Sequence, residues 1–175
     1  MLRQIVLGAA GAFACLSAAS AHVTLERAEA QVSASYKAVL RVPHGCSGTP
    51  TTAIRVRLPA GIIAVKPMPK PGWQLAVTTG KYPKPYTLRG APVTEGVTEI
   101  SWSGGKLLDA HYDEFVFVGT IAEELNGGQT IHFPVVQECE KGIHRWIEIP
   151  TGKHSHGHGA GSAEPAPALR LLPKK

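Results

Sequence analysis

The stretch that decides the fold is residues 51–58, which read T-T-A-I-R-V-R-L. Two arginines, Arg55 and Arg57, alternate with aliphatic residues in this stretch. The aliphatic positions are Ile54, Val56 and Leu58. Because successive side chains of a β-strand point to opposite faces, this alternation predicts a half-buried strand. Residues 59–61, Pro-Ala-Gly, then predict a turn that ends it.

Short segments of the same kind follow on both sides of this stretch. We expect strands over residues 36–42, 62–65, 73–79, 97–103, 115–120, 130–137 and 143–149. Three prolines exclude regular structure from residues 67–72, and residues 80–92 are interrupted, with one short candidate strand at 86–89. Gly104-Gly105 predicts a turn. Many short strands and no helical periodicity after residue 21 predict an all-β fold, a β-sandwich.

The first 21 residues have the features of a secretory signal peptide. Arg3 precedes an apolar segment from Ile5 to about Leu16, and Ala19-Ser20-Ala21 has the small-x-small form of a cleavage site. The apolar segment is too short to span a membrane comfortably, and no later segment is long and apolar enough. We therefore expect cleavage after Ala21 and an exported mature chain without a transmembrane segment.

Size, charge and the absence of catalytic motifs exclude several classes of function. Removing residues 1–21 leaves 154 of the 175 residues, the size of one domain. With Arg3 removed, 17 basic residues face 13 acidic ones, a mild excess with few aromatic residues to stack bases, so we expect no nucleic-acid partner. The chain has no Gly-x-Ser-x-Gly, His-Glu-x-x-His or phosphate-binding glycine loop, and we do not expect an enzyme.

Two cysteines, Cys46 and Cys139, remain after the signal peptide. They could be thiolate metal ligands, but an exported chain without a Cys-x-x-Cys motif favours a disulfide. The bond would close a loop of nearly a hundred residues, which contributes up to about 4–5 kcal/mol in the chain-entropy model.

Cleavage after Ala21 would make His22 the first residue of the mature chain. Its α-amine and imidazole could then chelate one metal ion, and imidazole suits copper, nickel or zinc. The alternative is that a histidine merely happens to follow the cleavage site. His44, in Val42-Pro43-His44-Gly45-Cys46, is either a second ligand or an exposed loop residue. A Cys46–Cys139 bond would bring His22, His44 and Trp146 within reach of one another.

Residues 143–149 place His144, Trp146 and Glu148 on one face. The opposite face carries Ile143, Ile147 and Ile149, which we expect in the core. For His144 and Glu148 the favoured interpretation is a solvated edge of the sheet, with one packing tryptophan.

The C-terminal region changes composition. Residues 151–167 are rich in His, Gly and Pro and are expected to be flexible. Their alternating histidines form a weak auxiliary metal site or an incidental polar linker, and the first of these is favoured: His154, His156 and His158. Residues 168–175 are expected to form an edge strand and a short tail, which leaves 22–150 as the main domain.

Several motifs in order resemble the YcnI-like copper-binding family, also described as a domain of unknown function, DUF1775. They are Ala21-His22-Val23-Thr24-Leu25, Tyr36-x-x-x-Leu40-Arg41-Val42-Pro43, Pro67-Met68-Pro69-Lys70-Pro71-Gly72-Trp73, Tyr112-Asp113-Glu114-Phe115, Phe133-Pro134-Val135-Val136-Gln137 and the late Trp146. The resemblance covers about residues 22–172.

This resemblance implies an Ig-like β-sandwich in the periplasm that binds Cu(II) through a mono-histidine brace. The brace maps onto His22, and a tryptophan over the copper, not itself an ordinary ligand, maps onto Trp146. The family pattern has a glutamate ligand shortly after Val-Pro, but this chain has His44 there. We take His44 as the substitute, with Glu138 or Glu140 as the fallback.

The leading functional hypothesis is therefore a periplasmic copper chaperone for trafficking or homeostasis. It would exchange Cu(II) with other copper-handling proteins of the envelope. A copper-dependent oxidative enzyme of the histidine-brace type is one alternative. A β-sandwich interaction module that binds no metal is the other.

Overall fold

The computed structural model describes residues 22–150 and 164–174, and no helix occurs among them. In these ranges no helix is long and apolar enough to span a membrane. The expected signal peptide, residues 1–21, lies outside the described residues. So do His154, His156 and His158.

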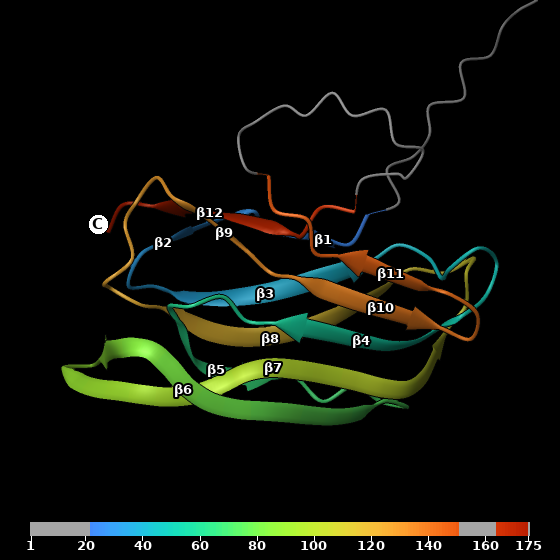
Figure 1. Cartoon of the computed structure of the whole chain (residues 1–175), viewed down its shortest axis with the longest axis horizontal. Coiled ribbons are helices and arrows are strands. Elements are labelled where there is room, and N and C mark those ends of the chain that lie inside the picture. The colour runs from blue at the N-terminus through green and yellow to red at the C-terminus, as the bar shows by residue number, and fades with distance from the viewer. Residues whose placement is uncertain (1–21, 151–163, 175) are drawn as a thin grey trace, which may run out of the picture.

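Two antiparallel sheets form the body of the molecule (Figure 1). The four-stranded sheet has, in spatial order, β1 (Thr24–Leu25), β3 (Ser35–Val42), β8 (Asp113–Ile121) and β5 (Ile62–Pro67). The five-stranded sheet has β11 (Ile143–Trp146), β10 (Val135–Cys139), β4 (Thr51–Arg57), β7 (Ala91–Leu107) and β6 (Gln74–Leu88).

A smaller sheet consists of β2 (Glu29–Gln31), β12 (Ala168–Leu172) and β9 (Thr130–His132). In Figure 1 it lies on the opposite side of the molecule from β6 and β7. β12 pairs with β2 on one side and β9 on the other, so it is the central strand. The expected edge position was wrong, because Leu169 and Leu171 are fully buried and draw this strand into the core.

The alternation in residues 51–58 produces β4 as expected. Ile54 and Val56 are fully buried, whereas Arg55 is half exposed and pairs with Glu99 and Glu138 on the two neighbouring strands. The core between the sheets combines large side chains from both. Among the fully buried ones are Leu40, Ile54, Ile100, Trp102, Phe115, Phe117 and Phe133. The predicted all-β fold is confirmed.

β6 continues through two prolines that were expected to interrupt it. The strand pairs only with β7, so its other edge needs no hydrogen-bond donors, and proline is tolerated at such an edge. Its register shifts between Lys81 and Tyr86, on either side of Pro83 and Pro85. The tight turn to β7 comes at Arg89 and Gly90, whose positive φ angles of 52° and 80° suit a two-residue hairpin.

Two other expected boundaries differ. Gly104-Gly105 lies inside β7 and is not a turn. A side chain at Gly105 would lie 2.1 Å from the Trp73 indole, so glycine leaves room for this ring, which lies just before β6. The expected strand 130–137 is divided before Val135 into β9 and β10, which belong to different sheets.

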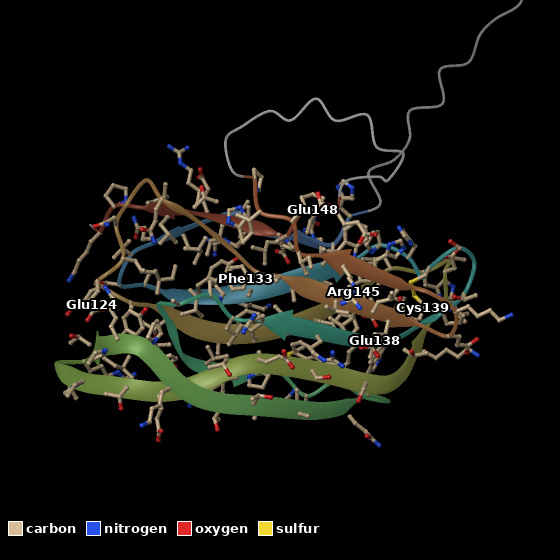
Figure 2. All side chains as sticks on the ribbon, viewed as in Figure 1. Glu124, Phe133, Glu138, Cys139, Arg145 and Glu148 are labelled. Carbon is tan, nitrogen blue, oxygen red and sulfur yellow. A yellow bond between two sulfur atoms is a disulfide. The ribbon has the colours of Figure 1, made fainter. Side chains whose placement is uncertain are left out.

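The expected disulfide is present between Cys46 and Cys139. Cys46 follows β3 of the four-stranded sheet, and Cys139 ends β10 of the five-stranded sheet, so the bond joins the sheets at one end. Figure 2 shows Cys139 beside Glu138 and far from Glu124, which lies at the other end of the molecule.

Removing this bond should lower the free energy of unfolding by up to about 4–5 kcal/mol, because it closes a loop across 93 residues. Urea unfolding of the mature chain and of a Cys46→Ala, Cys139→Ala variant measures the difference. Equal unfolding midpoints would contradict the assigned contribution.

The burial of Tyr36 should lower the free energy of unfolding at alkaline pH. Its side chain is buried and donates a 2.6 Å hydrogen bond to the Arg27 carbonyl. Burial raises the pKa of Tyr36 to about 12, opposed by Arg27 and assisted by Glu26. The stabilisation is fully present below pH 10 and is lost as the pH rises from 10 towards 12, by about 1.4 kcal/mol per pH unit.

Urea unfolding at pH 9, 10 and 11 should therefore show a shallower alkaline decline for Tyr36→Phe than for the parent chain. Tyr86→Phe is a useful comparison, since burial also raises the pKa of Tyr86. The interpretation fails if Tyr36→Phe and the parent lose stability at the same rate.

Candidate metal centre

The loop after β3 positions His44. Cys46 and Thr49 exchange two backbone hydrogen bonds of 2.9 Å, which close a tight turn. A side chain at Gly45 would lie 2.0 Å from the Thr49 carbonyl oxygen, so only glycine fits there. Nδ1 of His44 contacts the Gly45 carbonyl oxygen and lies 3.9 Å from an Asp109 carboxylate oxygen. Together with the disulfide, these contacts hold His44 on an ordered loop.

A buried glutamine, Gln137, connects this loop to Trp146. Its Nε2 group donates to the His44 carbonyl and to Thr51 Oγ1, both at 2.8 Å. Its Oε1 atom accepts a 3.0 Å hydrogen bond from Trp146 Nε1. Only 1% of Gln137 is exposed, and a buried amide without partners would be costly. The bonds therefore fix the His44 loop and the indole relative to each other.

Sequence reasoning did not identify Gln137 as part of the site. The available signal was its position in residues 135–139, where Gln137 alternates in phase with buried Val135. A polar amide at an inward-facing strand position must find partners inside the protein.

Trp146 is the centre of an aromatic cluster. It is 3% exposed, because β11 pairs it with Val135, whose side chain is fully buried. The His22 ring meets it edge-on, with centroids 5.2 Å apart and planes at 61°. His144 stacks on it at 5.0 Å and 27°. The predicted proximity of His22 and Trp146 is thus present in the structure.

β1 explains the position of His22. Thr24 pairs with Arg41 in the antiparallel β1–β3 ladder, so the residues before Thr24 run beside those that follow Val42. This register brings His22 to the end of β3 at which the His44 loop begins.

The expectation for the two faces of residues 143–149 was wrong. Ile143, Ile147 and Ile149 are 44%, 43% and 51% exposed, while Trp146 faces inward. Alternation does not say which face of a strand is buried, and here it continues in the sequence beyond the end of the strand. β11 ends at Trp146, and Glu148 lies beyond it in a bridge to Pro165.

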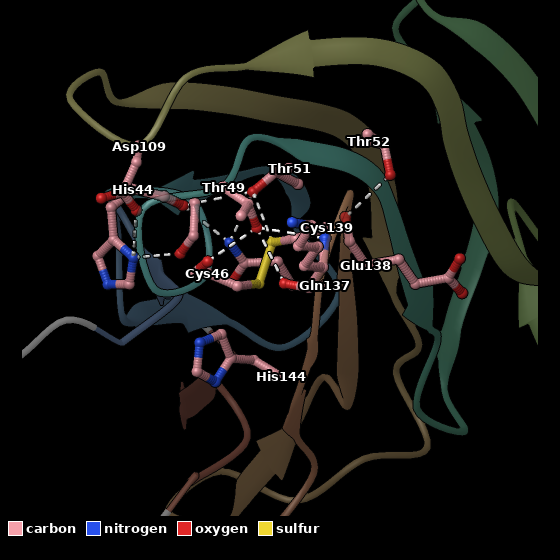
Figure 3. Close-up of a disulfide and its surroundings, with 12 residues drawn as sticks. His44, Cys46, Thr49, Thr51, Thr52, Asp109, Gln137, Glu138, Cys139 and His144 are labelled. Atoms are coloured by element: carbon pink, nitrogen blue, oxygen red, sulfur yellow. Dashed lines mark hydrogen bonds and ion pairs between the residues drawn. A yellow bond between two sulfur atoms is a disulfide. The ribbon is translucent and has the colours of Figure 1, made fainter.

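β11 lies at the edge of the five-stranded sheet and Glu148 is exposed, as expected, but His144 is half-buried and not fully solvated. Its Nδ1 lies 2.5 Å from Glu164 Oε1, and its ring lies 6.3 Å from that of His44, with planes at 85°. Figure 3 shows both histidines on the same side of the disulfide. The structure therefore places His144 near His44, one of the two histidines, His22 and His44, that the sequence indicated.

The fallback glutamates have other partners. Glu138 forms a 3.0 Å ion pair with Arg55, and Figure 3 shows its carboxylate on the far side of the disulfide from His44 and His144. Glu140 forms a 3.0 Å ion pair with Lys106. Neither glutamate side chain is paired with His44 or His144.

The donor set fits copper only if it includes more than side chains. Among residues 22–150 and 164–174, no three His, Cys, Asp or Glu side chains are arranged to hold a metal ion. A free α-amine at His22 would add a nitrogen donor beside an imidazole of the same residue. Amine and imidazole nitrogens together suit Cu(II). The residues present therefore fit copper in a chain that begins at His22.

Known proteins support the fold and the family. No curated protein matches the chain. A crystal structure described as an uncharacterized protein from Nocardia farcinica with an immunoglobulin-like fold has a TM-score of 0.61 and 23% identity, over 87% of this chain and 99% of that one. At this identity the similarity shows the fold alone, and the expected Ig-like sandwich is confirmed. The family described as a domain of unknown function, DUF1775, matches residues 22–171. The chain therefore belongs to the DUF1775 family.

Proposed function

We propose that this protein is exported to the periplasm and binds Cu(II) as cargo for trafficking or homeostasis. Cleavage after Ala21 would free the α-amine of His22. That amine and the His22 imidazole bind the ion, Trp146 lies over it, and His44 supplies a further nitrogen donor. The protein acts as a carrier rather than a catalyst.

The observation that carries this proposal is the contact between His22 and Trp146. A 5.2 Å separation brings the first residue of the expected mature chain against a buried indole. Gln137 links that indole to the His44 loop. The chelating residue is thus supported by a rigid frame, which reduces the entropy lost when the ion binds.

The arrangement also suits release. His22 is partly exposed and stands at the end of β3, outside the packed core. A site with few protein ligands leaves coordination positions open, so an incoming ligand can displace the protein's donors one at a time. The natural partners are other copper-handling proteins of the envelope, which accept the ion by ligand exchange.

A matched pair of chains tests the role of the α-amine. One begins at His22 and the other retains Ala21, and both carry serine in place of His154, His156 and His158. Retaining Ala21 converts the amine into an amide, so Cu(II) affinity should fall by more than the ~10–100-fold typical of losing an outer-shell partner. Isothermal titration calorimetry measures this change, after intact mass confirms each N-terminus.

Equal Cu(II) affinity in the two chains would refute binding through the His22 amine. Failure of both to bind Cu(II) would instead favour an interaction module without a metal. In the exported protein, an intact mass that begins at any residue other than His22 would also contradict the proposal.

Trp146 offers a spectroscopic test. A bound Cu(II) ion quenches nearby tryptophan emission, and the effect falls steeply with distance. Trp146→Phe should remove most of the copper-dependent quenching, although loss of the hydrogen bond to Gln137 should also cost about 1–3 kcal/mol of stability. Trp73→Phe is the control, since Trp73 packs against Phe115 instead. Equal fractional quenching in both variants would place the ion elsewhere.

A further inference from the structure

The outer edge of β6 differs from the other sheet edges among the described strands. The edge strands β1, β2, β9 and β11 have two to four residues each, and the edge strand β5 is interrupted by a register shift between Ile63 and Lys66. Short or irregular edges resist pairing with another chain. β6 has 15 residues and pairs only with β7, so one side of its backbone faces no described strand (Figure 1).

The two halves of this edge are protected differently. The second half contains Pro83 and Pro85, which have no N–H group to donate. In the same half, the Thr87 amide donates a 2.6 Å hydrogen bond to Glu124 Oε1. The first half, residues 74–80, reads Q-L-A-V-T-T-G and contains no proline and no charged side chain. Only the second half therefore has the features that prevent strand pairing.

The backbone of the first half faces outward at alternate residues. The Thr78 carbonyl accepts a 3.2 Å hydrogen bond from Thr98 Oγ1 on β7, so the Thr78 backbone is directed towards β7. Backbone groups alternate in direction along an antiparallel strand, which directs those of Leu75, Val77 and Thr79 away from β7. In the described part of the chain, no loop or side chain takes up the hydrogen bonds of these three residues.

The exposure of Val77 is a second, independent feature of this edge. Val77 pairs in register with Ile100, which is fully buried, so both side chains lie on the inner face of the sheet. Val77 is nevertheless 47% exposed, because no described strand pairs with β6 on its outer side. A strand added there would cover an apolar side chain as well as satisfy the backbone, and both effects favour association.

A second copy of the same segment fits this edge. Antiparallel pairing centred on Val77 places the two Val77 residues opposite each other and Leu75 opposite Thr79 of the second copy. Lys81 then lies opposite Trp73, so no two like charges face each other across the junction. The arrangement has twofold symmetry and closes at two copies, whereas a head-to-tail contact would continue.

We infer that this protein forms a dimer in which residues 74–80 of two copies pair antiparallel and join the five-stranded sheets. Because the paired segment is short, it covers less area than the roughly 1,200–2,000 Å² of a stable interface, so the dimer forms reversibly as concentration rises. β11 is the opposite edge of the same sheet, which leaves the candidate metal centre of each copy accessible. The dimer needs no copper.

Analytical ultracentrifugation of the chain that begins at His22, with a chelator present, tests the dimer. The parent should change from the mass of one chain to that of two as its concentration rises. Val77→Lys places two like charges at the twofold axis, so the dimer dissociation constant should rise more than ~10-fold. Ile143→Lys is the matched control, because Ile143 is 44% exposed on the opposite edge strand, and its dimer should match the parent's. Urea unfolding checks that each variant is folded.

Hydrogen exchange gives a readout that needs no variant. As the concentration of the parent rises, amide exchange in residues 74–80 should slow, because the outward N–H groups become paired. Exchange in residues 81–88 should not change, since that half of the edge is not part of the junction. Peptide mass spectrometry measures both segments in one sample.

Three results would overturn this inference, and none of them bears on copper binding. A parent chain that stays monomeric up to about 1 mM excludes a second copy and would assign the edge to an extended segment of another protein. An unchanged dissociation constant in folded Val77→Lys places the junction elsewhere. Exchange that slows with concentration only outside residues 74–80 does the same.

Discussion

The side-chain amide of Gln137 is the interaction on which the candidate site depends. Its three hydrogen bonds join Trp146 on β11, the His44 carbonyl after β3, and Thr51 at the start of β4. These elements come from both large sheets, and the Cys46–Cys139 bond closes the same end of the sandwich. Because the amide is almost wholly buried, breaking any of these bonds would leave a polar group without water.

This frame is what would let a β-sandwich without a side-chain metal cluster in its described residues form the proposed copper site. Trp146 provides a rigid wall, and the rings of His22 and His144 contact it from different parts of the chain. The α-amine that processing would create supplies a donor that no side chain replaces. The fold therefore positions the side chains of the proposed site, and cleavage after Ala21 would add the α-amine.

The fold could be predicted because its pattern is local. Alternation at residues 54–57 fixes both the strand and its buried face, and the two cysteines after residue 21 allow one pairing. Other features depended on partners distant in sequence. β6 tolerates Pro83 and Pro85 only because its outer edge is unpaired, and Trp146 faces inward because β11 pairs it with Val135. The interaction of His144 with Glu164 needed the C-terminal segment to return beside β11.

The most direct test is a crystal structure of the chain that begins at His22, loaded with one equivalent of Cu(II) and measured at the copper absorption edge. One anomalous peak is expected, bound by the His22 amine and imidazole, beside Trp146 and within bonding distance of His44. A peak elsewhere, or an ion held without the His22 amine, would contradict it.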